Sequence, residues 1–118
     1  MKCTSCIFIF LFAWQWSFGQ FVDTQSGKVE GTRTGNVYQF LGIPFAKPPT
    51  GQLRWRAPVS PDPWSATLSA KQFAPVCPQK RYEQGDTTYV LEGNEDCLYL
   101  NIWTPQTGSG NRAVMVFI

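Results

Sequence analysis

Glu95-Asp96-Cys97-Leu98-Tyr99-Leu100-Asn101-Ile102-Trp103 is the stretch that decides the fold of this chain. Its second half, Leu98–Trp103, alternates with a period of two residues and stops before Pro105, as a half-buried strand does. Farther along, residues 113–118 read Ala-Val-Met-Val-Phe-Ile and are apolar at every position. A run of that kind predicts a strand that is buried on both faces in the middle of a sheet.

The segments before this stretch also favour strands. Residues 22–24 and 28–33 flank Gln-Ser-Gly and predict a hairpin, because glycine supplies the positive φ that a tight turn needs. Residues 36–43 predict a third strand. A proline-rich connection then covers residues 44–63, where prolines force extended, irregular backbone. We expect at most a turn or two of helix, near residues 69–73. The layers that would cover residues 113–118 are therefore missing, which indicates an incomplete domain.

The composition excludes several kinds of site. The chain has 118 residues, about one domain, and contains no histidine, so neither a Ser-His-Asp triad nor a histidine-ligated zinc site can be completed from it. The net charge of +2 comes from basic residues that are spread along the chain, so a nucleic-acid partner is not expected. We assign no catalytic, cofactor-binding or metal-binding residue, and expect no cofactor.

The first 19 residues have the three parts of a secretory signal peptide. Lys2 is followed by an unbroken apolar run over residues 7–14, and Ser17 and Gly19 place small residues before a cleavage between Gly19 and Gln20. The alternative is a retained signal anchor, but polar residues dilute the second half of the stretch. No second apolar run of this kind follows, so the expected location is extracellular, with no membrane segment after the signal peptide.

The four cysteines separate into two pairs. Cys3 and Cys6 form a CxxC that is discarded with the signal peptide. Cys77 and Cys97 remain, an even pair in a chain routed to an oxidising compartment, and we predict one disulfide between them. Closing a loop of about 20 residues constrains the unfolded chain by roughly 3 kcal/mol. The alternative is a pair of free, buried thiols.

Several blocks together resemble the type-B carboxylesterase and cholinesterase family. Glu95–Ile102 is similar to its EDCLYLN signature, and further blocks agree with the family in order and spacing: residues 26–31, 40–51, 53–58, 63–64 and 77–79. The resemblance covers residues 22–118. It implies an α/β fold, in which residues 20–118 form the N-terminal, mostly β portion of an α/β-hydrolase domain.

The resemblance also implies a function and the place of its chemistry. Family members are typically secreted or membrane-anchored esterases with a Ser-His-Glu/Asp triad, and they continue from the strand at 113–118 into an oxyanion-hole turn. This chain contains no G-x-S-x-G motif. We therefore expect an N-terminal fragment of a secreted serine carboxylic-ester hydrolase, inactive alone, with a small-molecule ester as the substrate of the full-length protein. A membrane anchor beyond Ile118 stays open.

The resemblance also implies two structural pairs. Cys77 and Cys97 match the family's first disulfide loop, beside the entrance of the active-site gorge. Arg54 and Glu95 match a salt bridge that ties the proline-rich segment to the signature strand. The loop between the cysteines lacks the tryptophan on which cholinesterases bind a quaternary ammonium, which favours a general carboxylesterase.

Two further hypotheses remain open. One is a non-catalytic, neuroligin-like adhesion protein with the same fold. The other is a small secreted module that is complete at Ile118, against which the exposed apolar strand counts. The first differs from an esterase mainly at a nucleophile that this sequence does not contain.

Overall fold

The computed structural model describes residues 19–82, 88–105 and 110–118. Within them the elements are, in chain order, β1 (Gln20–Thr24), β2 (Gly27–Thr34), β3 (Val37–Pro44), η1 (Gly51–Leu53), β4 (Leu68–Ser69), β5 (Gln79–Tyr82), β6 (Tyr89–Glu92) and β7 (Tyr99–Thr104). Apart from the single 3-10 turn η1, the described elements are all strands. This arrangement agrees with the β portion of an α/β-hydrolase fold.

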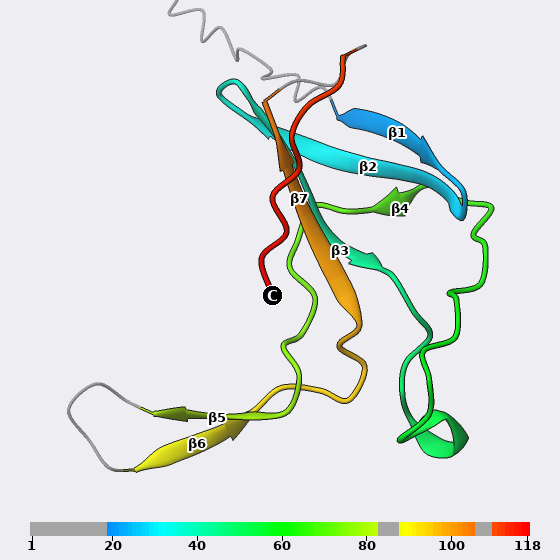
Figure 1. Cartoon of the computed structure of the whole chain (residues 1–118). Helices are drawn as coiled ribbons and strands as arrows, with labels where there is room; N and C mark the ends of the chain where they lie inside the picture. The colour runs from blue at the N-terminus through cyan, green and yellow to red at the C-terminus, as the bar shows by residue number, and fades with distance from the viewer. Residues whose placement is uncertain (1–18, 83–87, 106–109) are drawn as a thin grey trace, which may run out of the picture.

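The strands form one twisted sheet and a separate two-stranded ribbon (Figure 1). The main sheet has the order β1-β2-β3-β7, with antiparallel neighbours, and the short β4 pairs in parallel with β2. The predicted hairpin is confirmed as β1 and β2, which pair from Gln20↔Gly31 to Thr24↔Gly27. The predicted third strand is β3, and the alternating stretch forms β7.

The pairing of β3 with β7 joins residues that are about 60 positions apart in the chain. Phe40 lies opposite Ile102 and Ile43 lies opposite Leu100, with an irregularity in the register between these two pairs. Gly42 lies in this irregularity with φ of +70°, a backbone conformation that favours glycine. Its N–H donates to Oδ1 of Asn101 at 2.8 Å. A side chain of the signature strand therefore holds the bulge of β3.

The hydrophobic core lies where β2, β3 and β4 meet. Val29, Phe40, Ile43 and Ala70 are buried in one cluster, and partly buried residues pack against it: Val22, Tyr38, Trp64 and Leu68. Trp64 directly follows the proline-rich connection, and its indole Nε1 donates to the carbonyl of Lys28 at 2.9 Å. The connection is thereby fastened to the first hairpin.

Residues 69–73, the best candidate for a helical turn, form no helix in the structure. Leu68 and Ser69 instead pair in parallel with Val29 and Glu30, and the carbonyl of Ala70 accepts a hydrogen bond from the Leu41 N–H at 2.9 Å. The neighbouring strands offer backbone partners to this short segment, and these partners outweigh its weak local helical preference.

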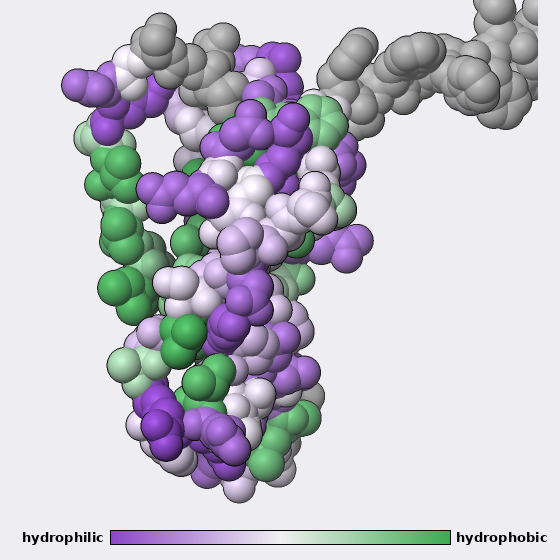
Figure 2. All heavy atoms as spheres, turned by 90° about the vertical axis from the view of Figure 1, so that its right-hand side faces the viewer, coloured by the Kyte–Doolittle hydropathy of each residue, from purple (hydrophilic) through white to green (hydrophobic). Residues whose placement is uncertain are grey.

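The strand expected at residues 113–118 is wrong, whereas the expected lack of a covering layer over these residues is confirmed. The structure assigns this segment no strand, and the side chains of Val114–Ile118 are between 76% and 111% exposed. A strand requires a hydrogen-bonded neighbour, and none of the described strands pairs with these residues. In the view of Figure 2, apolar side chains form a column along the left edge of the molecule.

Candidate functional site

One covalently constrained surface region surrounds a disulfide, and we call it the disulfide corner. The structure brings Cys77 and Cys97 together in a disulfide with a Cα–Cα distance of 5.0 Å. A hollow of about 230 Å³ lies beside it, lined by Pro49, Arg54, Trp55, Pro78, Glu95 and Cys97. The proline-rich connection, the start of the ribbon and the segment before β7 therefore meet at one place.

The ion pair suggested by the resemblance lies in this corner. Nη2 of Arg54 is 2.7 Å from Oε1 of Glu95, and the two side chains are 56% and 43% exposed. An ion pair this accessible to water contributes about 0–1 kcal/mol to folding. It therefore fixes the position of the proline-rich connection relative to β7 more than it stabilises the fold.

Trp55 has an unusual conformation next to this pair. Its φ is +61°, and its side chain is 94% exposed. A left-handed conformation costs a bulky L-residue about 1–2 kcal/mol. The guanidinium carbon of Arg54 lies 5.9 Å from the centre of the Trp55 ring, within the range of a cation–π contact. The corner therefore presents an exposed aromatic face bordered by charges.

The chain between the two cysteines forms the β5–β6 ribbon, which projects away from the main sheet (Figure 1). Arg81 pairs with Glu92 across the strands at 2.8 Å. The Nζ of Lys80 lies 4.1 Å from the centre of the Tyr89 ring, and the rings of Tyr82 and Tyr89 are 5.9 Å apart. The ribbon is therefore held by its own cross-strand contacts.

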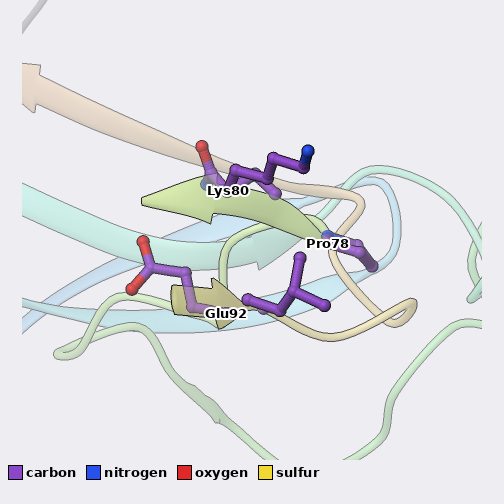
Figure 3. A pocket seen from close by; sticks show the side chains of 6 residues that line it. Pro78, Lys80 and Glu92 are labelled. Atoms are coloured by element: carbon purple, nitrogen blue, oxygen red, sulfur yellow. The ribbon is translucent and has the colours of Figure 1, made fainter. Parts of the chain in front are cut away.

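An open depression lies along this ribbon (Figure 3). It has a volume of about 350 Å³ and is lined by Pro78, Gln79, Lys80, Leu91, Glu92 and Gly93. Lys80 comes from β5 and Glu92 from β6, so both signs of charge border it. Glu92 pairs with Arg81, and the Lys80 ammonium lies over the Tyr89 ring, so both charged groups that line the depression already have partners.

One ionisable group near the corner is perturbed. Partial burial, together with a hydrogen bond to the Asp96 carboxylate and the charge of that carboxylate, raises the pKa of Tyr99 above its usual value of 10.0. The N–H of Asp96 in turn donates to Oδ1 of Asn94 at 2.9 Å. These contacts order the turn between the ribbon and β7.

The remaining predicted positions lie at the start of the described chain. Gln20 is the first residue of β1, and Gly19 precedes it. Residues 1–18, with Cys3 and Cys6 and most of the predicted signal peptide, lie outside the described residues. Within the described parts of the chain, no helix is long and apolar enough to cross a membrane. In the same residues, no group of three or more His, Cys, Asp or Glu side chains is placed to hold a metal ion.

Sequence reasoning missed the β5–β6 ribbon and the contact between Asn101 and Gly42. The ribbon had a usable signal, because residues 79–82 and 89–92 are strand-like segments separated by residues 83–88, which contain Gly and Asp. The Asn101 contact had none, since it depends on the register of two distant segments.

Known proteins of one family resemble this chain in sequence and in structure. The model of the Carboxylesterase family matches residues 19–118. The chain is 50% identical over 97 residues to the fumonisin B1 esterase of Sphingopyxis macrogoltabida, covering 80% of this chain and 17% of that protein. It is 41% identical to the juvenile hormone esterase of Tribolium castaneum, covering 100% and 22%. It is 38% identical to neuroligin-3 of Mus musculus, covering 77% and 14%.

A solved structure agrees with these relatives. The chain superposes on a PNB esterase with a TM-score of 0.64 and 43% identity, covering 78% of this chain and 18% of the other. The chain thus spans about a fifth of the length of the curated esterases that it matches. A family match over residues 19–118, in which the signature strand, the disulfide and the hairpin occur together, shows that this chain belongs to the carboxylesterase family.

Proposed function

We propose that these residues are the N-terminal scaffold of a secreted serine carboxylic-ester hydrolase, whose nucleophile and general base lie outside the 118 residues. The absence of histidine carries this proposal, because the serine of a triad needs a base to accept its proton. Family membership supports the reaction class. In this role the chain positions later segments through its sheet and its disulfide corner, and a small-molecule carboxylic ester is the substrate of the whole protein.

We further propose that the enzyme is not specific for choline esters. The loop between Cys77 and Cys97 contains no tryptophan. Tyr89 is a possible replacement as an aromatic surface for a cation, but the Lys80 ammonium already lies 4.1 Å from the centre of its ring. A quaternary ammonium at that face would have to displace an existing cation. A carboxylesterase with a broader range of esters fits these residues better.

Secretion belongs to the same proposal. Residues 1–19 have the pattern of a signal peptide, with cleavage between Gly19 and Gln20. The family match begins at residue 19, and β1 begins at Gln20, so the proposed cleavage would release the folded domain at the first residue of its first strand. The disulfide between Cys77 and Cys97 agrees with an oxidising compartment.

A non-catalytic binding protein is the second candidate, and the match to neuroligin-3 is the observation that favours it. Under this hypothesis the exposed Trp55 and the β5–β6 ribbon belong to a protein-binding surface. An esterase and a binding protein of this family would share the scaffold described above and would differ in the presence of a reactive serine.

The test uses the protein expressed from its complete reading frame in secreting cells. We expect the purified protein to react with a fluorophosphonate probe and to hydrolyse p-nitrophenyl acetate and p-nitrophenyl butyrate, with less activity toward acetylthiocholine. A secreted protein that the probe does not label and that hydrolyses none of these esters would support the binding protein instead. Preference for acetylthiocholine would contradict only the proposed specificity.

A further inference from the structure

Glu30 lies beside the point at which the proposed cleavage would create a new N-terminus. Glu30 faces Phe21 across β1 and β2, so its side chain shares a face of the sheet with positions 19 and 21. A side chain added at Gly19 would meet Oε1 of Glu30, with Cδ at 3.0 Å. The Glu30 carboxylate therefore fills the space beside position 19, and the Gln20 nitrogen is only two covalent bonds from the Gly19 Cα.

The carboxylate is held in place by a second charge. Nζ of Lys71 lies 2.6 Å from Oε1 of Glu30, and the Glu30 side chain is 24% exposed. Lys71 is brought there by its parallel bridge to Leu41. The next ion pair along the hairpin, Lys28 with Asp23, lies at the opposite end of β1, so among the ion pairs of the described residues it is Glu30 with Lys71 that lies beside position 19.

We propose that Glu30 binds the α-ammonium of Gln20 that cleavage after Gly19 releases, and that this contact protects Gln20 from cyclising to pyroglutamate. The inference rests on the cleavage proposed above. Cyclisation requires the uncharged amine. Its lone pair attacks Cδ of the Gln20 side-chain amide, a new C–N bond forms, the bond to Nε2 breaks, and ammonia leaves with the proton that the amine gives up. A protonated amine has no lone pair for this attack.

The size of the effect follows from acid–base equilibrium. An α-amino group has a pKa of about 7.7, so about a third of it is uncharged at about pH 7.4. A carboxylate within about 4–6 Å raises such a pKa. Since Glu30 is shared with Lys71 and partly exposed, we expect only a modest rise in the pKa of the Gln20 amine, which lowers its uncharged fraction. Cyclisation should therefore be about twofold slower than without Glu30.

The experiment uses protein from the complete reading frame, collected from the medium and incubated at about pH 7.4. Mass spectrometry of the N-terminal peptide follows the loss of one ammonia. We expect an N-terminus at Gln20 that is largely uncyclised at collection. Glu30→Gln should cyclise about twofold faster, and Lys71→Met, which removes the competing cation, should cyclise more slowly than the parent. Asp23→Asn is the matched control and should not change the rate.

Several results would overturn the inference. If Glu30→Gln cyclises at the parental rate, Glu30 does not protect the N-terminus. If Glu30→Gln and Lys71→Met both accelerate cyclisation, the inference is also wrong, because the shared effect would indicate fraying of β1. Complete cyclisation of the parent at collection would also contradict it. An N-terminus elsewhere than Gln20 would overturn both this inference and the proposed cleavage, while leaving the ester hydrolase proposal to its own test.

Discussion

Removing the disulfide should unfold the β5–β6 ribbon before it unfolds the main sheet. All four residues of β5 are exposed, and the described strands pair β5 and β6 only with each other. An isolated two-stranded hairpin is marginally stable at best in water. The ribbon therefore depends on the bond between Cys77 and Cys97 for its order, together with its own cross-strand contacts.

The magnitude follows from the loop that the disulfide closes. The two cysteines are 20 residues apart in sequence. Loop-closure entropy for about 20 residues corresponds to about 3 kcal/mol at room temperature. If the ribbon opens independently of the main sheet, this free energy appears as an increase of about a hundredfold in its opening equilibrium. The main sheet should lose much less, because its core at Val29 and Phe40 lies outside the loop.

Hydrogen exchange measured by mass spectrometry separates these two regions. In the variant Cys77→Ser/Cys97→Ser, peptides from residues 79–82 and 89–92 should exchange about a hundredfold faster, while peptides from β2 and β3 change little. The matched control is Arg81→Met, which keeps the disulfide and removes only the ion pair with Glu92, and should change exchange less than about fivefold. Ribbon amides that stay protected without the disulfide would refute the reasoning.

Three further predictions concern the sheet and the turn before β7. Gly42→Ala forces a Cβ onto a residue at φ of +70° and into a neighbouring carbonyl, so the free energy of unfolding in urea should fall by at least about 1–2 kcal/mol. In the control Gly110→Ala the new Cβ meets open space, and the free energy of unfolding should hardly change. Equal losses would contradict the assigned bulge. Phe40→Ala empties the centre of the core and should lose about 3–5 kcal/mol in the same assay; a loss below 1 kcal/mol would place the core elsewhere. The pKa of Tyr99 is raised in the folded state, so its contribution to stability is present below pH 10.0 and is lost as the pH rises through the folded-state pKa. Asp96→Asn should lower the pKa of Tyr99 toward 10.0 in a titration followed by phenolate absorbance. An unchanged titration would contradict the assigned contact with Asp96.

Local patterns predicted much of the main sheet. The alternation of Leu98–Trp103 and the stop at Pro105 correspond to β7, Tyr99–Thr104, because a period of two residues and a proline both act within the segment. The first hairpin and β3 were likewise predictable from turn residues and short apolar runs. The parallel pairing of β4 was not, since its two residues have no periodicity of their own and are ordered by β2.

At residues 113–118 the sequence predicted the missing cover correctly and the strand wrongly. Their apolar pattern indicates the environment that the segment would require, and the lack of helical segments elsewhere in the sequence indicated that this cover is missing. Whether a neighbouring strand pairs with them could not be judged from the segment itself. In the structure, Met115 is 94% exposed and belongs to no strand. An apolar run therefore predicts a buried strand only where other segments provide its hydrogen-bonding neighbours and its cover.

The candidate site also has some features that could be predicted from the sequence and others that could not. An even pair of cysteines after a predicted signal peptide favoured one disulfide, and the resemblance to the family pointed to Arg54 and Glu95. The positive φ of Trp55 and the position of Lys80 over the Tyr89 ring could not be foreseen, because both depend on the path of the backbone around the disulfide corner.

The central claim is that these 118 residues provide a scaffold and no catalytic group, and esterase activity of the chain alone tests it most directly. The purified, disulfide-bonded chain is assayed with p-nitrophenyl acetate, beside the protein from the complete reading frame at equal molar concentration. The account predicts that the 118-residue chain hydrolyses the ester at the rate of buffer, because no histidine is present to activate a serine. Saturable hydrolysis that follows the chain through repeated purification would contradict the account.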